Sequence, residues 1–127
     1  MEASGTLPSL TAEGAYAVQT ELTALRQTDG WTRVGYKLGY TSEAMRRQMG
    51  VSTPNFGPLF DHMTVPSGST VSQFVQPRVE PEVAVVLAED LSGTGLGIAE
   101  VATAVARVHA SVEIVDSIWT GYRFSYE

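Results

Sequence analysis

The sequence predicts an α+β fold, in which short helices and strands enclose one core. Apolar residues recur at helical spacing near the start of the chain, later segments have the apolar runs of strands, and glycine or proline separates the segments. The chain has 127 residues, of which 43% are hydrophobic and 17% are charged. These values suit one globular domain, so we expect residues 1–127 to form a single domain.

A helix is predicted over residues 12–29. Thr11 is suited to cap its start, and Asp29-Gly30 ends it. Its apolar positions share one face: Ala15, Val18, Leu22 and Leu25.

A strand is predicted over 31-WTRVGYKLGY-40. One face carries Trp31, Arg33, Gly35, Lys37 and Gly39, and the apolar face carries Thr32, Val34, Tyr36, Leu38 and Tyr40. A short helix should follow at about 43–49, capped by Ser42 and closed by Gly50. Residues 51–70 are rich in proline and glycine, which is typical of turns.

The second part of the chain predicts strands at about 71–75 and 79–88. A glycine-rich connection, 91–97, leads to a helix over 98–109, and a last strand covers 110–119. The aromatic tail after it, 119-WTGYRFSYE-127, favours burial against a partner.

Composition excludes several classes of function. The formal net charge of −6 and the lack of a basic stripe argue against binding to nucleic acid or to an anionic membrane surface. The absence of cysteine excludes disulfides and thiolate sites. No apolar run approaches the ~20 residues that span a bilayer, and the first residues do not resemble a signal peptide, so we expect a cytoplasmic protein.

Glu80 and Glu82 open an apolar run and, in a strand, point to the same face. That face continues into small or apolar residues, and the opposite face is apolar too, so we expect a strand covered on both sides. Two neighbouring carboxylates repel unless a lysine, an arginine or a metal offsets them. Paired glutamates also occur on solvated strand ends, so these two residues alone leave both interpretations open.

Three further features favour a site. Glu113 lies inside another apolar strand, whereas Asp116 is out of phase with it. Lys37 lies between glycines in a strand, which suggests close approach of a ligand or of backbone, although an edge lysine that reaches solvent is the alternative. Asp61 lies beside His62 in a loop, where a turn-forming aspartate is the simpler interpretation.

Three carboxylates without cysteine or histidine partners form a set of hard oxygen ligands. Such a set favours Mg²⁺ or Mn²⁺, whereas zinc usually recruits nitrogen or sulfur. Both histidines suit ordinary structural positions, because His62 lies in a turn and His109 ends the predicted helix.

Three strings carry a family resemblance: 35-GYKLGYTSEAMRRQMGVSTPNFGPLFDHM-63, 76-QPRVEPEVAVVLAEDL-91 and 112-VEIVDSIW-119. They resemble, in order, the 2-oxopent-4-enoate hydratase and 4-oxalocrotonate decarboxylase branch of the fumarylacetoacetate hydrolase superfamily. The match runs from roughly Leu10 to Phe124 and combines several motifs.

The resemblance implies the first half of a mixed β-sheet roll with flanking helices. It also implies that Glu80, Glu82 and Glu113 bind Mg²⁺ or Mn²⁺. Lys37 would be the catalytic lysine, Asp61 a pocket residue, and Leu38 a pocket residue that acts through its backbone. The implied activity is that of a metal-dependent lyase on a small 2-oxo acid, and the motifs do not separate the hydratase from the decarboxylase.

Members of that branch are roughly twice as long as this chain, so the resemblance covers a truncated domain. A homo-oligomer, or a second chain, would have to complete the sheet. The alternative is a non-catalytic or repurposed half-domain that binds a ligand or a partner chain.

Overall fold

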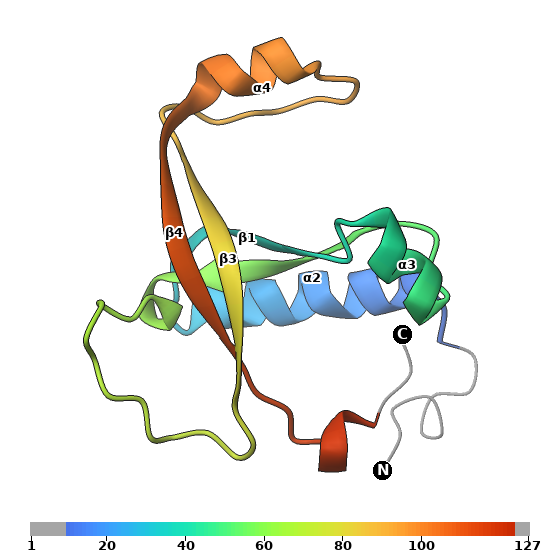
Figure 1. Cartoon of the computed structure of the whole chain (residues 1–127), viewed down its shortest axis with the longest axis vertical. Coiled ribbons are helices and arrows are strands. Elements are labelled where there is room, and N and C mark those ends of the chain that lie inside the picture. The colour runs from blue at the N-terminus through green and yellow to red at the C-terminus, as the bar shows by residue number, and fades with distance from the viewer. Residues whose placement is uncertain (1–9, 124–127) are drawn as a thin grey trace. The chain divides into compact units, whose positions relative to one another are not determined.

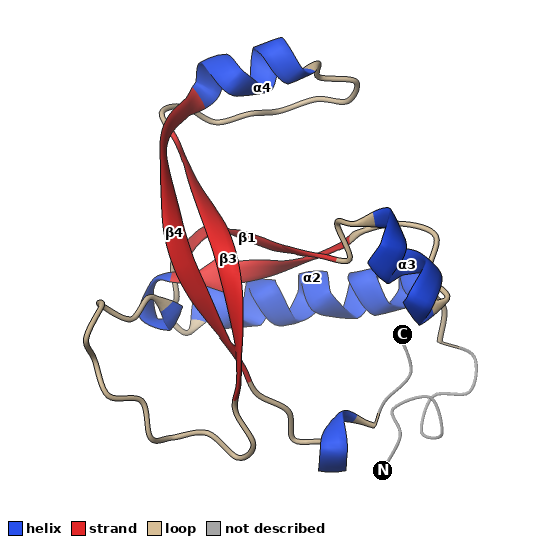
Figure 2. Ribbon diagram, viewed as in Figure 1, coloured by secondary structure: helices blue, strands red, loops and turns tan. Residues whose placement is uncertain are grey.

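A computed structural model describes residues 10–123 and confirms the α+β class (Figures 1 and 2). In chain order the elements are α2 (Ala12–Thr28), β1 (Arg33–Gly39), α3 (Glu43–Met49), β2 (Asn55–Phe60), the 3-10 turn η1 (Asp61–Met63), β3 (Arg78–Leu87), α4 (Ile98–Ala104), β4 (Val105–Val115) and the 3-10 turn η2 (Thr120–Tyr122).

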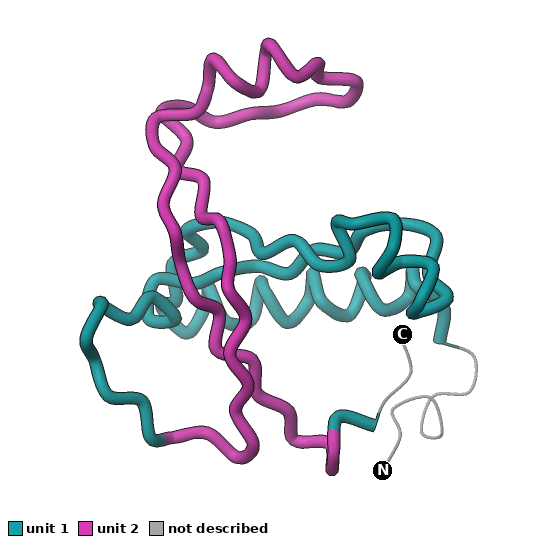
Figure 3. Tube along the Cα trace, in the orientation of Figure 1, with its two compact units in different colours: residues 1–72, 122–127 teal, residues 73–121 magenta. Residues whose placement is uncertain are grey.

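The chain divides into two compact units (Figure 3). The first is the described part of Met1–Ser72 and Tyr122–Glu127, and the second is Gln73–Gly121. Each unit contains one two-stranded antiparallel sheet, β1–β2 in the first and β3–β4 in the second.

The helix boundaries of the first unit agree with the sequence prediction. The Thr11 hydroxyl accepts a hydrogen bond from the Gly14 amide at 3.1 Å and caps α2. The Ser42 hydroxyl accepts from the Met45 amide at 3.2 Å, and Gly50 ends α3 with a φ of 70°. These signals are local in the chain, which is why the sequence predicted them.

Strand β2 was not predicted, because Pro54, Gly57 and Pro58 gave its segment the composition of turns. Pro58 nevertheless pairs with Tyr36 in the ladder. A two-stranded sheet has only edge strands, and an edge strand tolerates a proline whose missing N–H would face outward.

The α2 helix contacts β2 through a small set of side chains. The rings of Tyr16 and Phe56 stack at 4.7 Å, and the Phe56 amide donates to the Tyr16 hydroxyl at 3.3 Å. Gln19 donates to the Phe56 carbonyl at 3.3 Å. At the other end of β2, Phe60 is fully buried against the Trp31 ring, 5.4 Å between centroids. Aromatic contacts therefore hold this unit together.

The apolar faces of the helix and the strand at the start of this unit are largely exposed. The helix stripe of Val18, Leu22 and Leu25 is exposed, and so are Val34 and Leu38 on β1. Instead, Gly35, Lys37 and Gly39 form the half-buried face of β1. The apolar face of β1 is therefore not its less exposed face, because α2 contacts the sheet through Tyr16 and Gln19 rather than through its apolar stripe.

In the second unit, β3 and β4 form a long antiparallel ribbon with α4 at one end (Figure 1). The predicted strand at 71–75 is irregular backbone, and the helix predicted over 98–109 ends at Ala104. The following residues pair with β3, with Val108 opposite Val85. Cross-strand pairing of β-branched residues overrides the helical spacing that the sequence showed.

One face of this ribbon is apolar and exposed. Its residues include Val79, Val83 and Val112, which are 67%, 68% and 62% exposed. The expectation that both faces of β3 are covered is therefore wrong for the residues that the structure describes. Among these same residues, no helix is long and apolar enough to cross a membrane.

Candidate metal centre

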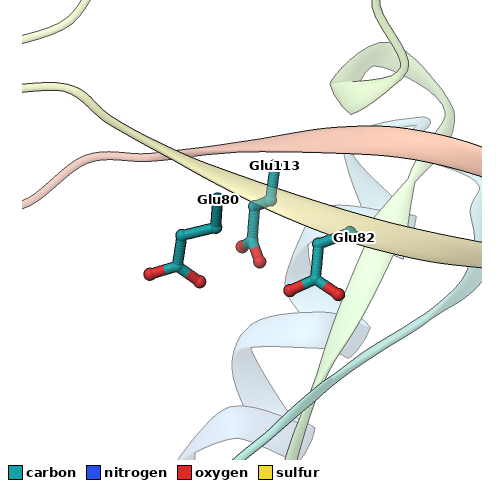
Figure 4. A group of neighbouring side chains, drawn as sticks. All are labelled: Glu80, Glu82 and Glu113. Atoms are coloured by element: carbon teal, nitrogen blue, oxygen red, sulfur yellow. The ribbon is translucent and has the colours of Figure 1, made fainter.

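Glu80, Glu82 and Glu113 gather on one face of the β3–β4 ribbon. Glu80 lies directly opposite Glu113 in the antiparallel register, and Glu82 lies opposite Ser111. Because side chains alternate along a strand and paired residues share a face, all three carboxylates project to the same side. Figure 4 shows the three side chains on that side of the ribbon.

The spacing of the three carboxylates suits one shared cation. One oxygen from each residue can be chosen so that all lie within 4.8 Å of one another. Oxygens bound to one Mg²⁺ at ~2.1 Å lie at most ~4.2 Å apart, so small rotations of the side chains would close the set. The donors are all carboxylate oxygens, the type that Mg²⁺ and Mn²⁺ prefer. The residues present therefore fit such a cation.

Charge compensation within the protein is the alternative to a metal. Arg78 shares the face of Glu80 and Glu82, because it lies two positions before Glu80 on β3. Glu80 and Glu82 are exposed and Glu113 is half-buried. Solvent therefore reaches the three carboxylates, and a dissolved cation could do so as well.

The same face carries two residues that the sequence analysis did not assign to it. Ser111 lies opposite Glu82, and His109 lies opposite Ala84. The prediction that His109 ends a helix was wrong, because β4 begins at Val105. The signal was present in the period-two pattern of 105–115, in which polar residues alternate with apolar ones.

Lys37 belongs to the first unit, where it is half-buried on β1 and pairs with Gly57. A side chain at Gly57 would begin 3.6 Å from Cγ of Lys37, so this glycine leaves room beside the lysine. At Gly39 an added Cβ would lie 2.1 Å from Oδ1 of Asn55. The neighbouring Asn55 side chain therefore explains why position 39 is a glycine. Leu38 lies on the opposite face of β1 and is exposed.

Asp61 also belongs to the first unit, at the start of η1. Its Oδ1 accepts hydrogen bonds from the amides of His62, at 3.0 Å, and Thr32, at 3.3 Å. The Asp61 amide donates back to the Thr32 carbonyl at 2.9 Å. The His62 ring meets the Trp31 ring edge-on at 3.9 Å between centroids. The carboxylate of Asp61 thus fastens η1 to the start of β1.

The pKa of the Asp61 carboxyl is lowered from its ordinary value of 3.8, first by the hydrogen bond from the His62 amide and also by that from Thr32. Both amides stabilise the ionised form. The structure thus brings the three glutamates together in the second unit and places Lys37, Leu38 and Asp61 in the first.

Comparison with known proteins tests the family resemblance. No family model matches the chain. The chain is 40% identical over 119 residues to 4-oxalocrotonate decarboxylase from Pseudomonas putida, covering 92% of this chain and 45% of that protein. It is also 40% identical over 114 residues to 2-keto-4-pentenoate hydratase from Burkholderia vietnamiensis, covering 88% of this chain and 44% of that protein.

The chain is a homologue of these decarboxylases and hydratases. It spans about half the length of the curated relatives that it matches. The resemblance predicted from the motifs is confirmed.

Solved decarboxylase structures confirm the fold. A 4-oxalocrotonate decarboxylase from Pseudomonas putida G7, complexed with magnesium and adipate, matches with a TM-score of 0.91 at 36% identity, over 98% of this chain and 48% of that chain. The same enzyme complexed with calcium and acetate matches with a TM-score of 0.85 at 37% identity, over 91% of this chain and 46% of that chain. The fold of this chain therefore corresponds to about half of the decarboxylase fold.

The lowered pKa of Asp61 predicts a pH-dependent stability. A depressed carboxyl pKa stabilises the folded state above the unfolded value near 3.8, and this contribution is lost as the pH falls through the folded pKa. Asp61→Asn should therefore lower the Tm at pH 7, and the difference from wild type should shrink below about pH 5. Thermal unfolding across a pH series measures the difference in Tm between wild type and Asp61→Asn. A difference that stays constant with pH would contradict the prediction.

Proposed function

We propose that this chain is part of a metal-dependent lyase that acts on a small 2-oxo acid. The reaction is hydration of the 2-hydroxypenta-2,4-dienoate type or decarboxylation of the 4-oxalocrotonate type. The observation that carries the proposal is the cluster of Glu80, Glu82 and Glu113 on one face of a ribbon, in a chain homologous to such enzymes.

Glu80, Glu82 and Glu113 would hold Mg²⁺ or Mn²⁺ through carboxylate oxygens. The solved relatives are complexed with magnesium or calcium, which are both hard, oxygen-binding cations. When bound, the cation supplies Lewis-acid stabilisation of the enolate that hydration and decarboxylation of 2-oxo acids share.

Lys37 is the only lysine in the chain and is proposed to hold or transfer the proton at its Nζ atom. Its ammonium form would also stabilise negative charge that develops on the substrate. Asp61 is proposed as a pocket residue, and Leu38 is proposed to contribute its backbone to substrate binding. The family resemblance supports these three assignments.

The exposed apolar surfaces support an assembly with another polypeptide. The ribbon face with Val79, Val83 and Val112 carries no charged residue among the described pairs from Val79 to Val108. Burial of such a face is favourable, and large exposed apolar patches mark interaction sites. The proposed partner is a second copy of this chain, so that a homo-oligomer completes the sheet.

The metal proposal predicts a thermal shift. Mg²⁺ or Mn²⁺ should raise the Tm of the wild-type chain, since a ligand that binds only the folded state stabilises it. Glu82→Ala should abolish the shift, whereas Glu89→Ala, in a loop of the same unit, should keep it. If Arg78 compensates the carboxylates instead, the wild type will show no metal-dependent shift, and the metal site is then wrong.

The lyase proposal predicts turnover of 2-hydroxypenta-2,4-dienoate or 4-oxalocrotonate in the presence of Mg²⁺. Lys37→Ala should reduce kcat/KM by about 10²–10⁴-fold, the usual contribution of a proton-transferring group. Lys37→Arg keeps the positive charge but cannot release a proton near neutral pH. Equal loss in both variants would support proton transfer, and retained activity in Lys37→Ala would contradict the assignment. Metal binding without turnover of either substrate would favour the repurposed half-domain.

The assembly proposal predicts a dimer or larger species in sedimentation velocity. Val83→Lys should dissociate it, because a lysine on the apolar face opposes burial. Thr94→Lys, which adds the same charge in an exposed loop, should leave the assembly intact. A well-folded wild-type monomer would contradict the proposal.

A further inference from the structure

The open end of the β3–β4 ribbon is closed by the carboxylate of Asp116. Its Oδ2 accepts a hydrogen bond from the Val75 amide and its Oδ1 accepts one from the Gln76 amide, both at 2.8 Å. These are charge-assisted bonds, which are stronger than bonds between neutral groups. The Val75 amide first, and then the Gln76 amide, lower the pKa of Asp116 from its ordinary value of 3.8. The carboxylate therefore stays ionised near neutral pH.

Gln76 makes the reciprocal connection. Its Nε2 donates to the carbonyls of Ser117, at 2.7 Å, and Trp119, at 2.6 Å, and its Oε1 accepts from the Gly121 amide at 3.2 Å. Ser117 is buried, and its hydroxyl accepts from the Trp119 amide at 3.1 Å. Five hydrogen bonds between described residues thus join the segment before β3 to the segment after β4, and we call this set the end clamp.

The end clamp lies next to the register that forms the metal site. The last pair of the ladder is Arg78 with Val115, and the pair of Glu80 with Glu113 lies two positions further in. The three carboxylates come from both strands. A slip of one residue would move Glu113 away from Glu80 and turn it to the opposite face.

Several features of the ribbon favour a slip of this register. A two-stranded ribbon is only marginally stable by itself. Pro81, between the two glutamates of β3, donates no backbone hydrogen bond. The far end is closed by a long connection through α4, and the ladder is irregular there between Val86 and Leu87. The end clamp adds a constraint beside the last pair of the ladder, on the side of the glutamates.

We propose that Asp116 and Gln76 are positioning residues for the metal centre, because the end clamp holds Glu113 opposite Glu80. This inference rests on the proposed binding of a metal by Glu80, Glu82 and Glu113.

The test compares two clamp variants with opposite changes in charge. Asp116→Asn replaces one acceptor oxygen by a donor and removes a negative charge. Gln76→Glu removes the donors to Ser117 and Trp119 and adds a negative charge. Titration calorimetry with Mn²⁺ on the full chain should give an affinity about tenfold weaker in both variants. This is the lower end of the loss in metal affinity that follows when a residue that orients a metal ligand is replaced. If the change in charge were the only cause, Asp116→Asn would bind Mn²⁺ more weakly and Gln76→Glu would bind it more tightly.

Two controls separate positioning from general effects. Asp90→Asn removes a negative charge from a loop of the same unit and should leave the affinity for Mn²⁺ unchanged. Ala104→Gly affects a buried residue at the far end of the ribbon, so it should lower the Tm while the affinity stays that of wild type. If the end clamp only stabilised the fold, the two clamp variants would lower the Tm as Ala104→Gly does, and their affinity for Mn²⁺ would stay that of wild type.

The outcomes are distinct. Wild-type affinity in both clamp variants, or stronger binding in Gln76→Glu, would overturn the inference, and so would an equal loss of affinity in Ala104→Gly. If Asp116→Asn does not fold, Gln76→Glu decides. If wild type fails to bind Mn²⁺, or Glu82→Ala binds as wild type does, the proposed metal site is wrong and the positioning role falls with it. A wild type that binds, beside clamp variants that bind equally well, overturns the positioning role alone.

Discussion

The register of one antiparallel pair fixes the geometry of the candidate metal centre. It sets Glu80 directly opposite Glu113 and Glu82 beside them. Like charges in opposing positions destabilise a sheet, and one oxygen from each of the three carboxylates lies within 4.8 Å of the others. A cation bound beside them would offset repulsion between the carboxylates, which is the basis of the proposed metal site. The hydrogen bonds of Asp116 and Gln76 at the ribbon's end keep that register in place.

The two units bury few hydrophobic side chains and leave apolar faces exposed to solvent. Among the described residues, Phe60 and Ala104 are the buried hydrophobic side chains. The ribbon face opposite the glutamates and the stripe of α2 are both apolar and exposed. The chain spans about half the length of its decarboxylase and hydratase relatives. Large exposed apolar faces mark interaction sites, which is the basis of the proposed homo-oligomer.

Local signals explain which elements were predictable. Thr11, Ser42 and Gly50 act within one helical turn, and the observed helix ends agree with them. Strand β2 was missed, because Pro58 within it and Pro54 before it indicate turns unless the edge position is known. The helix at 98–109 was predicted too long, because Val105 and Val108 suit helical spacing and also a strand. Pairing with β3 decides between them, and that contact joins residues far apart in the sequence.

By itself, the sequence determined the α+β class, the family resemblance and the three glutamates, because caps, periodicity and motifs are encoded in neighbouring residues. Only the tertiary structure decided that Glu113 faces Glu80, that Ser111 and His109 share their surface, and that Asp116 secures the ribbon. The predicted burial of both faces of β3 was wrong for a related reason. An apolar pattern shows which surface prefers to leave water, but whether another segment covers that surface is a property of the folded assembly.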